Sequence, residues 1–177
     1  DETSLSIAGG FGKIVLGQDD DAADAYNIDE MDLIAEEPTA TVTSMTIGTS
    51  SSISSDDADK VAYHLPAMGG LTAGISHTDR SAAGGTDTTS YGAKYAMDAA
   101  GASITLGYAV VSDENATQDV DMENMGMKIV SGDISVIVSQ GGTESNDEDI
   151  QNAGASISYK MPNGMTVGAY TFKSEDD

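Results

Sequence analysis

The sequence lacks cysteine and tryptophan, and it has only two phenylalanines and three prolines among its 177 residues. Without cysteine, neither a disulfide framework nor a thiolate metal site can form. Aromatic residues make up 5% of the chain, which is little for a large close-packed globular core. No run of about 18 apolar residues occurs, so only strands with apolar residues at every second position could cross a membrane.

Positive charge is also scarce. Seven Lys and Arg residues stand against thirty Asp and Glu residues, and the formal net charge is -23. This imbalance argues against a basic patch that binds nucleic acid or an anionic membrane surface. The charge predicts cations as partners, or other charged surfaces bridged by divalent ions.

What the sequence does have is a series of short turns that contain glycine, flanked by alternating apolar and polar residues. Leu5-Ser6-Ile7 before the first turn and Ile14-Val15-Leu16 after it show this alternation, which favours antiparallel hairpins over a disordered chain. The five turns lie at Gly9–Gly12, Pro66–Gly70, Asp98–Gly101, Ser131–Asp133 and Met161–Gly164. Short turns at one rim and long acidic loops at the other indicate an up-and-down sheet, as in an outer-membrane barrel.

The fold class predicted from this pattern is all-β: an antiparallel up-and-down transmembrane β-barrel with about ten strands of roughly 6 to 10 residues, in one domain over 1–177. The long connections are expected at 18–59, 78–87, 112–121 and 140–152, with a tail from Lys173. The first far exceeds the usual loop of about 4 to 6 residues. A short helix could form in it before Ile34, and a Ser/Thr-rich stretch follows from Thr39 to Ser55.

Three segments carry a resemblance to a known family. The hairpin from Ser6 to Gln18, with a Phe11-Gly12 turn and a Leu16-Gly17 pair before the acidic loop, resembles the general diffusion porins of Gram-negative bacteria. Lys60 to Gly74 and Tyr91 to Tyr95 are similar to porin strands as well. The resemblance covers the whole chain, and its acidity and Gly/Ala content are closest to alphaproteobacterial porins.

The resemblance implies a barrel of about 16 strands in the outer membrane of a Gram-negative bacterium. This chain would be an internal portion that supplies ten of them, with strands missing at both ends. The resemblance further implies a homotrimer in contact with lipid and lipopolysaccharide, and a water-filled channel, not an enzyme, for passive diffusion of small hydrophilic solutes and ions. Loop 18–59 would fold into the pore.

In such a pore, carboxylates of the loop would face basic residues of the wall and favour cations. The predicted constriction acids are Asp19, Asp20, Asp21, Asp24, Asp29, Glu30, Asp32, Glu36 and Glu37. The predicted wall bases are Lys94, Lys128 and Lys160, on the parity opposite the large apolar residues, together with Lys13, which lies just after a tight turn. The basic cluster of the family is largely arginine, whereas Arg80 is the only arginine here and lies in a loop. The alternative to a pore lining is an acidic loop in solvent, with lysines that only keep an exposed strand face hydrophilic.

Acidic runs such as Asp19-Asp20-Asp21 offer oxygen ligands for calcium, although their spacing does not fit an EF-hand loop. No other cofactor is expected. No cysteine nucleophile and no G-x-S-x-G motif points to catalysis. Two other proteins fit the same pattern: a complete ten-stranded outer-membrane barrel, and a secreted acidic β-rich adhesin or surface structural protein.

Overall fold

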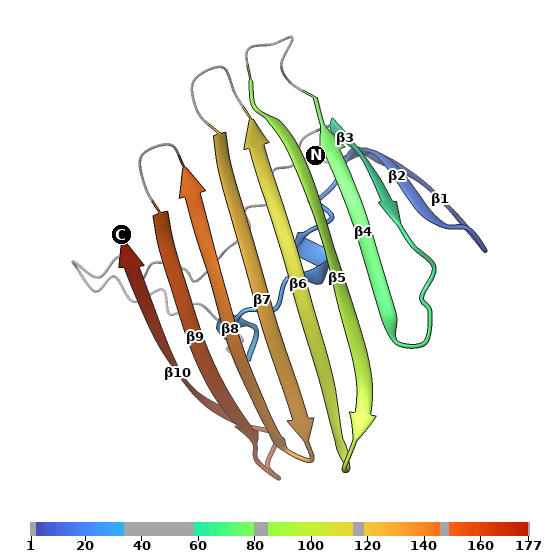
Figure 1. Cartoon of the computed structure of the whole chain (residues 1–177). Coiled ribbons are helices and arrows are strands. Elements are labelled where there is room, and N and C mark those ends of the chain that lie inside the picture. The colour runs from blue at the N-terminus through green and yellow to red at the C-terminus, as the bar shows by residue number, and fades with distance from the viewer. Residues whose placement is uncertain (1–2, 34–58, 80–84, 115–118, 146–148, 177) are drawn as a thin grey trace.

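The computed structural model describes residues 3–33, 59–79, 85–114, 119–145 and 149–176. In this part of the chain, ten strands form one antiparallel sheet in which each strand pairs with the next (Figure 1). They are β1 (Ser4–Gly9), β2 (Gly12–Gln18), β3 (Asp59–His64), β4 (Leu71–Thr78), β5 (Asp87–Ala99), β6 (Ala102–Glu114), β7 (Asp119–Ser131), β8 (Ile134–Ser145), β9 (Asp149–Lys160) and β10 (Thr166–Asp176). The predicted up-and-down antiparallel order is confirmed. Among these strands, β1 and β10 are not paired with each other.

The strands from β5 onward are longer than the sequence indicated. β5, β6 and β7 have 13 residues each, and at about 3.3 Å per residue and a tilt of about 45° such a strand covers about 30 Å along the membrane normal. The connections predicted at 112–121 and 140–152 are wrong in extent, because Glu114 pairs with Asp119 and Glu144 with Asp149. Polar side chains at a rim stay hydrated while their backbone groups continue the ladder.

The turns at the opposite rim are short, as predicted. Gly9 pairs with Gly12, Ala99 with Ala102 and Ser131 with Ile134, which leaves two residues in each turn. Glycines at positive φ angles accompany two of these turns, Gly101 at φ 81° and Gly132 at φ 58°. Such φ angles match the right-handed twist of the flanking strands.

The two faces of the sheet differ in side-chain size. One, here called the outer face, carries large apolar residues that are exposed, among them Leu16, Val61, Ile75, Tyr91, Tyr95, Leu106, Met125, Val138, Ile157 and Val167. The other, the inner face, carries mainly small, polar or basic residues, including Ala62, Ser76, Ser90, Gly92, Lys94, Gly107, Asn124, Gly126, Lys128 and Ser156. This alternation is typical of a strand with lipid on one side and a polar lumen on the other.

Residues 19–33, here called the acidic segment, lie on the inner face. They form two short 3₁₀ helices, η1 (Asp24–Tyr26) and η2 (Glu30–Leu33), where the sequence indicated one short helix. η1 packs against β5 and β6, and η2 packs against β8 and β9. In Figure 1 this segment passes behind the central strands. In the described residues, no helix is long and apolar enough to span a membrane.

A small apolar cluster lies beneath the start of the acidic segment. Ala23 has no exposed surface and packs with Ala109 and Val111 of β6. Met122 of β7 borders the cluster. The core of this part of the fold therefore lies between the acidic segment and the inner face.

Candidate functional site

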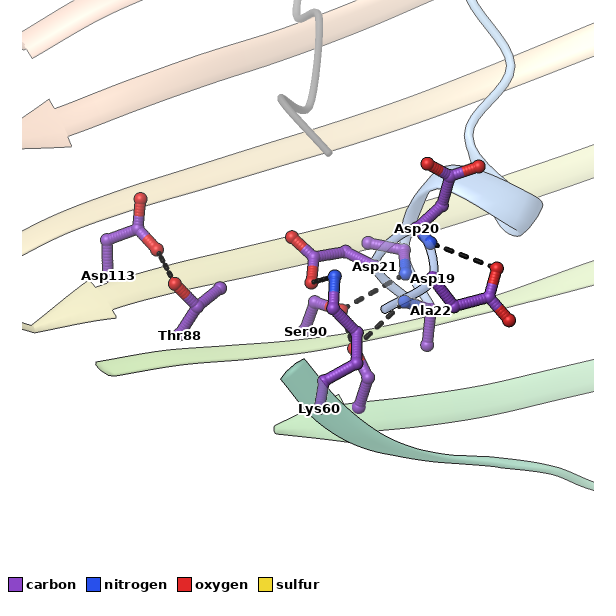
Figure 2. A network of polar contacts seen from close by, with 10 residues as sticks. Asp19, Asp20, Asp21, Ala22, Lys60, Thr88, Ser90 and Asp113 are labelled. Atoms are coloured by element: carbon purple, nitrogen blue, oxygen red, sulfur yellow. Dashed lines mark hydrogen bonds and ion pairs between the residues drawn. The ribbon is translucent and has the colours of Figure 1, made fainter. Parts of the chain in front are cut away.

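The acidic segment starts at a buried ion pair. The Nζ atom of Lys60, at the beginning of β3, donates to Oδ1 of Asp21 over 2.7 Å. The two side chains are 0% and 3% exposed, respectively. Figure 2 shows the pair beside the wall strands. Because both charges are withdrawn from water, removal of either side chain would leave the other charge buried without a partner, which is strongly destabilising.

Two serines of the wall bind the backbone next to this pair. The amide of Ala22 donates to Oγ of Ser76 over 2.9 Å, and the amide of Ala23 donates to Oγ of Ser90 over 3.2 Å. The two hydroxyl groups are hydrogen-bonded to each other at 2.7 Å. Both serines are buried on adjacent strands, where Ser76 pairs with Ser90 in the register of β4 and β5. Amides that no helix or strand satisfies thus find partners in the wall.

Further along, Tyr26 joins the segment to β3. Its Oη atom lies 2.8 Å from Nδ1 of His64 in a hydrogen bond. The two rings lie at 5.9 Å between centroids. The Tyr26 side chain is buried, so the hydrogen bond satisfies a polar group that has left water.

A row of glycines on four neighbouring strands makes this approach possible. A Cβ atom on Gly92 would lie 2.7 Å from Cβ of Tyr26, and one on Gly126 would lie 2.1 Å from the carbonyl oxygen of Ile28. Gly74 and Gly107, the other two members, would also bring a Cβ within 3 Å of Tyr26 or Ile28. We call Gly74, Gly92, Gly107 and Gly126 the glycine track. Only residues without a side chain allow the segment to lie directly on the strand backbones.

Opposite charges meet where the segment crosses the central strands. Lys94 on β5 interacts electrostatically with Asp32 and Asp24, and also with Lys128 on β7. The side chains of Asp24 and Asp32 are exposed, and those of the two lysines are half-buried. Carboxylates of the segment therefore interact electrostatically with an ammonium group of the wall; the transverse field across a pore stays a prediction.

The electrostatic surroundings of Asp24 alter its titration. Loss of hydration beside the wall raises the pKa of its carboxyl group above the ordinary 3.8, and the negative charge of Asp20 adds to this effect. Lys94 opposes the rise in pKa, while Asp21 and Asp32 support it. Asp24 therefore gains a proton at a higher pH than an ordinary aspartate.

The other predicted site residues fall into different surroundings. Asp19 and Asp29 are half-buried, Asp20 is exposed, and so are Lys13 and Lys160. Glu30 belongs to η2, but its side chain lies outside the described part, as do Glu36 and Glu37. Asp21, buried with Lys60, does not face open space. The role of the full set in lining a pore stays a prediction.

Among the described residues, no three His, Asp or Glu side chains come together in an arrangement that could hold a metal ion. The run Asp19-Asp20-Asp21 has Asp21 in its ion pair with Lys60 and Asp19 in a hydrogen bond to the amide of Asp20. Calcium binding at this run stays a prediction.

Sequence reasoning missed Lys60, the serine pair, the Tyr26–His64 contact and the glycine track. One signal was present, because Lys60 shares the parity of Ala62 and His64, which is the small-residue parity of its strand. The glycines also share one parity across neighbouring strands. The sequence pattern does not predict the position along the strands at which the acidic segment crosses the sheet, because that position depends on tertiary contacts.

An antiparallel sheet with an apolar exposed face, and with a charged segment laid on its small-residue face, is the wall of an outer-membrane β-barrel. The chain belongs to the Gram-negative porin family, whose model matches residues 1–177. Its place is therefore the outer membrane, which confirms the family and the location expected from the sequence.

A solved structure of an outer-membrane protein shows the same fold at low identity. OmpT of Vibrio cholerae, an outer-membrane protein, matches with a TM-score of 0.66 and 14% identity, over 99% of this chain and 60% of that chain. A mutant of OmpT from which loop L8 is deleted matches with a TM-score of 0.49 and 15% identity, over 99% of this chain and 74% of that chain. The chain thus spans about 60% of the length of the first of these structures. No curated protein matches the sequence.

Proposed function

We propose that this chain forms part of a water-filled outer-membrane channel through which small hydrophilic solutes and ions diffuse passively, with a preference for cations. The observation that supports the proposal is the electrostatic interaction of Lys94, on the inner face, with Asp24 and Asp32 of the acidic segment. Acids grouped at a narrow passage favour cations. The excess of acid over base in the whole chain acts in the same direction.

The proposal includes the role of the first long loop and the partners of the whole protein. Loop 18–59 would narrow the pore, and its described part lies on the inner face in keeping with that role. The complete protein would be a homotrimer, surrounded by lipid and lipopolysaccharide, and would catalyse no reaction. Family membership supports these points.

A soluble adhesin is the less favoured alternative. In a soluble β-sandwich the large apolar face of a sheet packs against a second sheet. Here Ile75, Met125 and Ile157 are about half exposed on the outer face, at 49%, 59% and 50%. An apolar face left open in this way suits contact with lipid.

The test is conductance of the full-length protein in a planar lipid bilayer. We expect stepwise ohmic currents and, in a salt gradient, a reversal potential whose sign indicates cation preference. In the double variant Asp24→Asn/Asp32→Asn the cation preference should fall, because two carboxylates opposite Lys94 are lost. Asp133→Asn, in a two-residue turn at the far rim, is the matched control and should leave the preference unchanged. A protein that inserts but carries no current would overturn the proposal.

A further inference from the structure

We propose that Lys60, the serine pair Ser76/Ser90 and the glycine track are positioning residues that fix the height and course of the acidic segment on the wall. In this way residues that do not face the open part of the lumen set the width and selectivity of the passage. The anchoring of the segment is argued from the contacts alone. Its effect on conductance and selectivity rests on the proposed channel function.

The first group of positioning residues is polar. It consists of Lys60, Ser76 and Ser90, which we call the polar anchor. It engages three consecutive residues, Asp21 through its carboxylate and Ala22 and Ala23 through their amides. All the participating side chains are buried: Asp21 is 3% exposed, Ser76 2% and Ser90 0%. Such contacts are screened little by salt, and removing one member of the ion pair would leave the other charge buried and uncompensated.

The second part is steric. The glycine track runs obliquely over β4, β5, β6 and β7, and Tyr26 and Ile28 rest on it. Gly74 pairs with Gly92 and Gly107 pairs with Gly126 in the strand register, so the track consists of two cross-strand glycine pairs. The track determines how close the segment comes to the wall, and hence how far the segment reaches into the lumen.

The two parts act on adjacent stretches of one segment. The polar anchor holds residues 21–23, and the track begins under Tyr26, three residues later. Between them lies Asp24, one of the two carboxylates that interact electrostatically with Lys94. Since Asp24 is fixed from both sides, its distance from the wall lysines depends on contacts in which it takes no part.

Amide hydrogen exchange of the folded protein in detergent or lipid tests the anchor without reference to transport. In the native protein the amides of Ala22 and Ala23 should exchange slowly, because both donate to buried serine hydroxyls. In Lys60→Met the loss of one member of the buried pair should speed their exchange roughly a hundredfold. Lys173→Gln removes the same charge from a side chain that is 67% exposed, and should leave the exchange unchanged.

A double variant distinguishes an anchor from a residue that is needed only for folding. Lys60→Met/Asp21→Leu replaces the whole ion pair by apolar side chains, so no charge is left buried without a partner. Exchange at Ala22 and Ala23 in the double variant should return toward the native rate. If the double variant exchanges as fast as Lys60→Met, or if these amides exchange freely in the native protein, the polar anchor is refuted.

The glycine track is tested by adding a single methyl group. Gly126→Ala places a Cβ atom 2.1 Å from the Ile28 carbonyl oxygen, so the segment must move away from the wall. We expect a lower unitary conductance, because the segment shifts into the passage. Lys60→Met should have the opposite effect, with larger and noisier currents. Gly10→Ala, where no atom lies within 4 Å of the new methyl group, is the control.

The two measurements separate the two proposals. Protected amides at Ala22 and Ala23 in a protein without conductance support the anchor and refute the channel. Native conductance that is unchanged in both Lys60→Met and Gly126→Ala supports the channel and refutes the positioning role.

Discussion

Single residues of the acidic segment divide into two kinds of carboxylate. Asp21 forms a buried ion pair with Lys60, and its side chain has almost no exposed surface that a solute could contact. Asp24 and Asp32 are exposed and interact with Lys94. The sequence makes these aspartates look alike, and only their neighbours in space give them different chemistry.

Asp24 should give cation selectivity a pH dependence. The raised pKa means that its carboxylate loses charge as the pH falls, and does so before an ordinary aspartate would. Cation preference, measured from reversal potentials at a series of pH values, should therefore decline through a first phase above the ordinary value of 3.8. Asp24→Asn should abolish that phase. At neutral pH the variant should already show the weaker cation preference that the native protein reaches once Asp24 is protonated. A first phase that survives in Asp24→Asn would assign it to another group.

Tyr26 should contribute through its hydroxyl group and its ring separately. Tyr26→Phe removes the hydrogen bond to His64 but keeps the ring on the track, and should lower the free energy of unfolding by about 1 kcal/mol. Tyr26→Ala also removes the buried ring and should lower it by about 3 to 5 kcal/mol. Urea titrations of the protein reconstituted in lipid vesicles measure both values. Equal losses in the two variants would show that the ring does not pack as described.

At the scale of whole elements, the hairpins could be predicted and the path of the loop could not. Alternation in β6, where Leu106 and Tyr108 face outward and Gly107 and Ala109 face inward, depends on one strand alone and is visible in sequence. The Lys60–Asp21 pair joins residues 39 positions apart, and nothing local to either one indicates its partner. The sequence pattern also ends the strands too early. Acidic residues such as Asp113 and Asp121 indicate a loop by their polarity, although their backbone groups still pair with the neighbouring strand.

The hairpin between β5 and β6 should gain stability from a better turn residue. Ala100 has φ 54° and Gly101 has φ 81°, so both central residues of this two-residue turn lie in the left-handed region. An alanine there is disfavoured by about 1 to 2 kcal/mol, whereas asparagine tolerates it. Ala100→Asn should therefore raise the free energy of unfolding by about 1 kcal/mol, and Gly101→Ala should lower it by a similar amount. Urea titration in vesicles is again the measurement, and a destabilised Ala100→Asn protein would contradict the described turn.

At the scale of the whole molecule, negative charge lies both on the inner face and at the long-loop rim. Asp121, Glu123, Glu144 and Asp149 occupy the outer side of that rim on β7, β8 and β9, while Asp24 and Asp32 belong to the acidic segment on the inner face. With a net charge of -23, the potential near the passage combines close carboxylates with many more distant ones. Salt should separate these two contributions, because it screens the distant charges first.

Cation preference should therefore weaken as ionic strength rises, but should not vanish. The Debye length falls from about 10 Å at 0.1 M to about 3 Å at 1 M salt, so charges at the rim cease to act on an ion in the passage. Carboxylates that a permeating ion touches are screened much less. Reversal potentials at a constant concentration ratio, measured from 0.1 to 1 M potassium chloride, should show a falling preference that levels off above zero. In Asp24→Asn/Asp32→Asn the remaining preference at 1 M should be lost, while the low-salt preference persists in part, because the rim acids are intact. A double variant that keeps the native preference at 1 M would show that the acidic segment does not line the narrow part of the path.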